Sequence, residues 1–179
     1  VKNSEMIIHL CSLTQQPHSD QNQPIIYGGT KLLLDTVLKR NKNCKKIVFV
    51  STTNVYGFFK GEKIICDEKI MPNPVSSYAE SKIKAENLCM EYWKKHGIPT
   101  VSIRLSTNFG YADGIRQDFF LNNIIWNSLL YDKVNVFGRR DNWRPFIHVK
   151  DAAKILLTLV QDTSIGNGEL YNVGSEELN

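Results

Sequence analysis

Thr52, Tyr78 and Lys82 are polar residues whose types and spacing could move a proton on and off an alcohol. Tyr78 and Lys82 lie four residues apart at the start of a helical pattern, so they share one helix face. A phenol titrates at roughly pH 10, and a cation beside it lowers that pKa because it favours the phenolate. A threonine hydroxyl can hydrogen-bond the same substrate oxygen. The three residues together predict acid–base chemistry on an alcohol while a cofactor takes the hydride.

The Tyr-x-x-x-Lys spacing alone is weak evidence, since a chain with seven tyrosines and this many lysines contains it about once by chance. The order of the surrounding elements is more specific. Lys46–Val50 is a short apolar run typical of a buried parallel strand, and Thr52 follows its carboxyl end, where open α/β sheets bind ligands. The sequence then reads Ser-Thr-x-x-Val-Tyr-Gly at residues 51–57 and Pro-x-Ser-x-Tyr-x-x-Ser-Lys at residues 74–82.

This order resembles the extended short-chain dehydrogenase/reductase family, and within it the nucleotide-sugar epimerases and dehydratases. The resemblance covers the chain from about His9 to Gly174. It implies an α/β fold with a Rossmann-like, doubly wound parallel sheet and a smaller substrate-binding portion. It also implies that Thr52, Tyr78 and Lys82 are the catalytic residues.

The cofactor site is expected where the first strand, Met6–Leu10, ends. That segment resembles the family's His-Leu-Ala-Ala, whose backbone runs beside the cofactor, and two small residues replace the alanines here. His9 is expected to be a buried structural residue. The resemblance implies an NAD or NADP site lined by Leu10, Cys11, Ser12, Tyr78, Lys82 and Thr107.

The substrate implied by the resemblance is a nucleotide sugar. Residues 104–110 resemble the family's Arg-x-x-Asn-x-Tyr-Gly, which implies that Asn108 contacts the substrate diphosphate. Arg144 matches an arginine that holds a diphosphate oxygen, a role suited to its planar fork. Asp118 and Phe119 open a helix where the family's substrate domain meets the nucleotide. Phe137, in the short strand expected at 134–138, either flanks the base or belongs to a small core.

Two departures from the family pattern bear on the activity. Ile26 stands where the family's Asn-x-x-Gly-Thr helix has its asparagine, which removes a polar contact. Thr53-Asn54 stands where the 4,6-dehydratases carry Asp-Glu for water elimination. The sequence therefore favours an epimerase, with a dehydratase or reductase of the same family as alternatives. A non-catalytic dinucleotide-binding regulatory protein also remains open.

The bulk composition excludes several other classes. The 179 residues are 42% hydrophobic and 22% charged, which excludes a disordered chain, and the net charge of +4 is not gathered into a stripe that would bind nucleic acid. The four cysteines have no C-x-x-C spacing, so neither a metal site nor a disulfide framework is expected. No apolar run is long enough for a membrane span and no secretory signal is present, so a cytoplasmic protein is expected.

The domain organisation follows from the same resemblance. Residues 1–105 are expected to form a partial Rossmann core, whose amino-terminal glycine-rich βαβ units lie outside this chain. Residues 106–144 are expected to supply most of the substrate-binding portion, and residues 145–179 return to the core. The resemblance also implies a homodimer.

Overall fold

A parallel sheet between two layers of helices forms the core of this computed structural model, which describes residues 1, 3–13, 19–58, 65–131 and 144–175. The strands are β1 (Met6–His9), β2 (Lys46–Thr52), β3 (Thr100–Leu105), β4 (Thr107–Phe109), β5 (Phe146–His148) and β6 (Leu170–Val173). The α-helices are α1 (Gly29–Arg40), α2 (Ser77–His96), α3 (Phe120–Tyr131) and α4 (Val149–Gln161). A π-helix η1 (Gln23–Gly28) leads into α1, and a 3₁₀ helix η2 (Thr53–Tyr56) follows β2.

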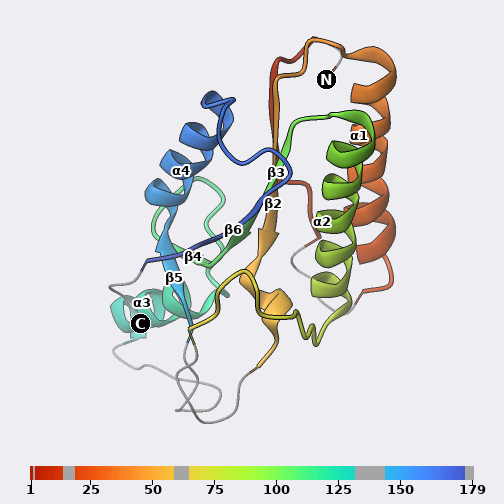
Figure 1. Ribbon diagram of the computed structural model, residues 1–179. Coiled ribbons are helices and arrows are strands. Elements are labelled where there is room, and N and C mark those ends of the chain that lie inside the picture. Colours follow the sequence, from red (N-terminus) through yellow and green to blue (C-terminus); the bar gives the residue numbers. More distant parts are fainter. Residues whose placement is uncertain (2, 14–18, 59–64, 132–143, 176–179) are drawn as a thin grey trace.

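The main sheet has the order β1-β2-β3-β6, and all its neighbouring strands are parallel. Helices α1 and α2 cover one face and α4 covers the other (Figure 1). This arrangement confirms the predicted α/β class. Strand β2 is buried at all seven positions because helices cover both faces of the sheet, as its continuous apolar run predicted.

Successive side chains of β2 enter different cores, because side chains alternate across a strand. Ile47 and Phe49 pack in the core under α1 and α2, whereas Val48 and Val50 pack in the core under α4. The strand is therefore fixed in register from both sides, and Thr52 is held at a defined place at its carboxyl end.

A second, two-stranded sheet joins segments far apart in the sequence. Strands β4 and β5 pair in parallel, so residues 107–109 lie beside residues 146–148. Helix α3 lies at the same end of the molecule (Figure 1). The strand predicted at 134–138, including Phe137, lies outside the described residues, and the domain boundaries stay a prediction.

The helix predicted from Pro24 to Arg40 has the expected extent but begins as a π-helix. Ile26 lies in this first part, is fully buried and packs in the core under α1 and α2. The hydroxyl of Thr30 donates to the Ile26 carbonyl at 2.7 Å. The isoleucine at this position therefore contributes to the core, while its backbone still serves as an acceptor.

Candidate active site

The three predicted catalytic residues come from two elements that pack against each other. Thr52 is the last residue of β2, and Tyr78 and Lys82 lie in the first two turns of α2. The Ser76 hydroxyl accepts a hydrogen bond from the Ala79 amide at 3.2 Å and so begins α2 at a fixed place. The Thr52 hydroxyl accepts from the Asn54 amide at 3.2 Å, which begins η2. These two caps thus fix where α2 and η2 begin, close to Tyr78 and Thr52.

The Tyr78 phenol lies among hydroxyl groups. The side chains of Ser12 and Thr52 both lie close enough to favour its ionised form. Beside Tyr78, the Ser77 hydroxyl donates to the Ser19 carbonyl at 3.1 Å, which holds Ser19 against the start of α2. The structure therefore brings Ser12, Thr52 and Tyr78 together from three separate parts of the chain.

Lys82 is buried, with 2% of its surface exposed. Its ammonium group donates to the Val50 carbonyl at 2.7 Å and lies 5.0 Å from the Phe49 ring centroid and 5.8 Å from that of Tyr78. Burial lowers the pKa of Lys82 to about 8. Lys82 is thus charged at neutral pH and close to losing that charge.

The prediction that Lys82 lowers the pKa of Tyr78 is wrong for the structure described. Burial raises the pKa of Tyr78, and the Ser12 and Thr52 hydroxyls only partly offset this effect. The Lys82 ammonium donates to a backbone carbonyl and lies over the face of the phenol ring. Tyr78 is therefore a neutral phenol at neutral pH, so its role as a base requires further stabilisation of the phenolate.

We expect Lys82→Met to abolish turnover yet raise the free energy of unfolding at pH 7 by about 1–3 kcal/mol. An unfolded lysine titrates near pH 10.5, whereas folded Lys82 titrates at about 8, so keeping the amine charged destabilises the fold below pH 8. This cost disappears as the pH rises from 8 to 10.5, and the advantage of the variant should disappear with it. Urea unfolding at pH 7 and pH 10 measures both effects, and a variant less stable than wild type at pH 7 would contradict the expectation.

His9 has the structural role that the sequence predicted. Its Nε2 lies 2.9 Å from the Thr30 hydroxyl oxygen, and its ring lies 5.6 Å from the Phe49 ring. Because Thr30 donates its own proton to the Ile26 carbonyl, it accepts from His9 Nε2–H. Burial, followed by the charge of Lys82, lowers the pKa of His9 to about 4, so the imidazole is neutral.

The end of β1 offers unused polar groups to a cofactor. Leu10 and Cys11 are exposed there, while the Ser12 hydroxyl oxygen is buried and makes no hydrogen bond within the part of the chain described. An ammonium group has three N–H donors, and the bond to Val50 accounts for one of those on Lys82. The Ser12 hydroxyl and the remaining N–H groups of Lys82 could therefore hydrogen-bond the hydroxyl and amide groups of a dinucleotide. The sequence placed Ser12 beside the cofactor by its backbone and missed the hydroxyl next to Tyr78, although a serine in place of alanine was the available signal.

Ser12→Ala is expected to raise the pKa of Tyr78 further, because one of the two hydroxyls that stabilise the phenolate is lost. The change can be followed by NMR of ring-labelled tyrosine, with Tyr78→Phe identifying the resonance. Ser164→Ala is a matched control, since this exposed serine bonds Asp162 in its own turn. An unchanged Tyr78 titration in Ser12→Ala would contradict the expected role.

The predicted diphosphate contact lies in β4. The side-chain carbonyl oxygen of Asn108 is buried and has no hydrogen-bond partner in residues the structure describes, as a ligand contact would require. The family motif, counted from Arg104 to Gly110, instead puts its asparagine at Thr107. Neighbouring strand residues point to opposite faces, so Thr107 and Asn108 cannot share one role. Both assignments stay predictions.

The remaining predicted substrate residues are not joined to this cluster by any described contact. The Asp118 carboxylate accepts from Arg116 Nε at 2.9 Å, and this bond lowers the pKa of Asp118. The Arg116 guanidinium also lies 4.3 Å from the Phe119 ring centroid. Arg144 is exposed. The structure thus orders Asp118 and Phe119 around Arg116, and their nucleotide contacts stay predictions.

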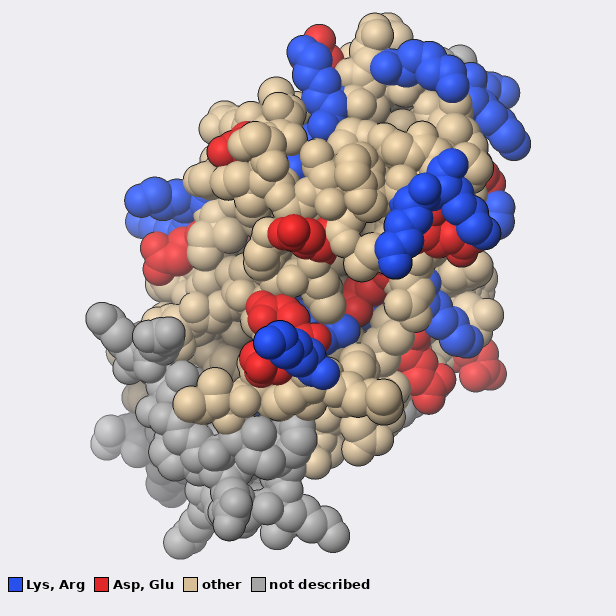
Figure 2. Space-filling view, in the orientation of Figure 1, with Lys and Arg blue, Asp and Glu red and all other residues tan. Residues whose placement is uncertain are grey.

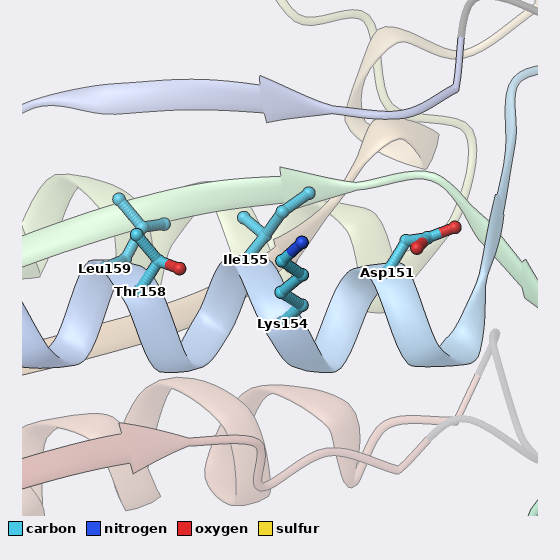
Figure 3. A pocket seen from close by; sticks show the side chains of 5 residues that line it. All are labelled: Asp151, Lys154, Ile155, Thr158 and Leu159. Carbon is cyan, nitrogen blue, oxygen red and sulfur yellow. The ribbon is translucent and has the colours of Figure 1, made fainter.

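A shallow groove on α4 lies apart from these residues. Figure 3 shows its five lining side chains along α4, which covers the opposite face of the sheet from α2: Asp151, Lys154, Ile155, Thr158 and Leu159. In Figure 2, basic and acidic groups are interspersed over most of the face shown. Within the described ranges, no group of three or more metal-binding side chains occurs, and no helix has the length and apolar character to cross a membrane.

Several proteins similar to this chain are named as nucleotide-sugar enzymes. The chain is 28% identical to a dTDP-D-glucose 4,6-dehydratase of Dictyostelium discoideum, over 96% of the chain and 41% of that protein. It is 29% identical to an uncharacterized UDP-glucose epimerase, YtcB, of Bacillus subtilis, over 77% of the chain and 42% of that protein. The chain thus spans less than half the length of these curated relatives.

Two solved structures extend the comparison. A dTDP-glucose 4,6-dehydratase of Bacillus anthracis in complex with NAD superposes with a TM-score of 0.81 at 25% identity, covering 96% of this chain and 51% of that one. A UDP-glucuronic acid 4-epimerase of Bacillus cereus in complex with NAD gives 0.80 at 26% identity, covering 96% and 54%. Residues 1–174 match the NAD dependent epimerase/dehydratase family as a whole, and this match, together with the shared Rossmann-like fold, shows that the chain belongs to that family of extended short-chain dehydrogenases/reductases.

Proposed function

We propose that the protein containing this chain is an NAD(P)-dependent nucleotide-sugar epimerase. The observation that carries the proposal is the placement of Thr52, Tyr78 and Lys82 together, at the carboxyl end of β2 and against the first turns of α2. Relatives named as epimerases and relatives crystallised with NAD support the reaction class.

Thr52, Tyr78 and Lys82 have different roles in the reaction of one sugar hydroxyl. When bound, the cofactor would supply the hydride acceptor and later return the hydride to the sugar carbon. Once ionised, the Tyr78 oxygen takes the hydroxyl proton and later gives it back, while the Thr52 hydroxyl donates a hydrogen bond to the same sugar oxygen. Lys82 offers N–H groups to the cofactor ribose. The burial of Lys82 keeps water from screening its charge.

The positions after Thr52 favour an epimerase over a dehydratase. Thr53 and Asn54 form the start of η2, and neither carries the carboxylate that the elimination of water requires. Dehydratases nevertheless occur among the relatives, so a dehydratase or a reductase of the same family remains the second candidate. The nucleotide base, the homodimer and the cytoplasmic location also stay proposals.

The test uses the full-length protein with NAD and a panel of UDP-, dTDP-, GDP- and CDP-sugars, followed by NMR of the sugar. Inversion at one carbon without net NADH, absent in Tyr78→Phe, would support an epimerase and identify its substrate. Loss of water with formation of a keto sugar would indicate a dehydratase, and net consumption of NADPH a reductase. Cofactor binding without turnover of any sugar would contradict the proposal and favour a binding protein.

A further inference from the structure

A pair of opposite charges is buried behind the catalytic helix. Glu86, on α2, is 7% exposed and Arg104, on β3, is 3% exposed. The Arg104 guanidinium binds the Glu86 carboxylate in a bidentate manner: Nε donates to Oε1 at 3.1 Å and Nη2 donates to Oε2 at 2.8 Å. The Ser51 hydroxyl donates to the same Oε1. The Glu86 carboxylate therefore accepts hydrogen bonds from both β2 and β3.

The remaining guanidinium nitrogen of Arg104, Nη1, extends this hydrogen-bond network. This nitrogen donates to the Tyr56 hydroxyl oxygen at 2.9 Å, and that hydroxyl lies 2.9 Å from the Asn172 side-chain carbonyl on β6. The Asn172 amide group in turn donates to the Cys66 carbonyl at 3.0 Å. One connected set of polar groups thus fixes α2, β2, β3, β6, η2 and the segment after residue 65.

Two members of this network, Ser51 and Glu86, lie close in the chain to predicted catalytic residues. Ser51 precedes Thr52 in β2. Glu86 follows Lys82 by one helical turn and Tyr78 by two, so all three lie on one face of α2. A buried ion pair contributes little net stability, because desolvation offsets its attraction. Its position against this helix face points to a role in the catalytic centre instead.

Glu86 also acts on the charge of Lys82. Burial is the main influence on the Lys82 pKa and lowers it, whereas Cys11, Glu86 and Cys89 raise it. Burial raises the pKa of the Cys89 thiol to about 12, so Cys89 stays neutral at physiological pH. The charge of Lys82 in turn acts on His9, whose pKa burial lowers to about 4, so His9 is also neutral. The Val50 carbonyl supplies the direct hydrogen bond from β2. Glu86 is thus the one carboxylate that acts on Lys82 within the described structure.

We propose that Glu86, held by Arg104 and Ser51, is a positioning residue of the catalytic centre. It fixes the face of α2 that carries Tyr78 and Lys82 relative to Thr52, and its carboxylate favours the charged form of the buried Lys82 amine. The inference rests on the proposed function for the meaning of that charge, but the electrostatic effect itself can be measured without turnover.

The test compares Glu86→Gln with wild type in the full-length protein. Glutamine keeps the shape and can still accept a hydrogen bond from Arg104 while it removes the charge. The matched control is Glu91→Gln, on the same helix, because Glu91 is exposed and forms an ion pair with Lys95 at the surface. NMR of lysine labelled with ¹³C at Cε gives the Lys82 pKa, with Lys82→Arg identifying its resonance.

Lys82 is expected to titrate on the order of one pH unit lower in Glu86→Gln and at the wild-type pH in Glu91→Gln. The alkaline limb of kcat/KM should move down with it, a shift that a merely structural defect does not produce. If Glu86→Gln does not fold, the neutral pair Glu86→Gln/Arg104→Met replaces it in the same titration. An unchanged Lys82 pKa in the folded variant would overturn the inference even if sugars are turned over. Conversely, failure of every sugar to react would contradict the proposed function and leave the titration to decide the role of Glu86.

Discussion

Tyr78→Phe is expected to lower kcat by about 10²–10⁴-fold, because it removes the hydroxyl that we propose takes the sugar proton. The change is confined to one oxygen, since the phenylalanine ring can keep the packing of Tyr78 against the core under α1 and α2. Cofactor binding should persist, because the Lys82 N–H groups that we propose to contact the cofactor ribose remain. Single-turnover kinetics with the sugar identified by the panel measures the effect.

The matched control for this change is Tyr111→Phe. Tyr111 is 80% exposed and loses the same hydroxyl without a place in the catalytic cluster. It should retain wild-type turnover. A Tyr78→Phe variant that keeps more than about a tenth of wild-type kcat would mean that another group moves the proton. That result would also contradict the roles proposed for Thr52 and Lys82.

Arg104→Met is expected to lower the free energy of unfolding by about 3–5 kcal/mol, because it leaves the Glu86 carboxylate buried without its cation. The Tyr56 hydroxyl loses its donor at the same time. Urea unfolding at neutral pH measures the loss. Removing both charges together, in Glu86→Gln/Arg104→Met, should recover much of it, since a neutral pair needs no counter-charge.

Arg40→Met provides the comparison for that experiment, because this exposed arginine ends α1 at the surface. Its effect should stay within about 0.5 kcal/mol. If Arg104→Met lowered the free energy of unfolding as little as Arg40→Met, Glu86 would not depend on Arg104 as its counter-charge. If the double variant were no more stable than Arg104→Met alone, the unpaired carboxylate would not be the cause of the loss.

The sequence predicted those parts of the site that depend on local order. Strand β2 was recognisable because burial on both faces leaves a continuous apolar run. The relation of Tyr78 to Lys82 followed from helical spacing alone. The buried partner of Glu86 did not follow, since Arg104 stands 18 residues away on another element. The direction of the Tyr78 pKa was missed for the same reason, because burial depends on tertiary packing that no local pattern encodes.

The two attachment points of α2 limit which changes in chain length the protein can tolerate. A helix turns by about 100° for each residue, so one residue inserted between Lys82 and Glu86 would rotate one attachment away from its strand while the other stayed in place, and one inserted between Tyr78 and Lys82 would rotate Tyr78 away from Lys82. Both Lys82, bound to the Val50 carbonyl, and Glu86, bound to Arg104, lie in the interval 78–86. Insertions and deletions among homologues should therefore avoid residues 78–86 and collect in surface segments between elements, such as the segment between η2 and α2.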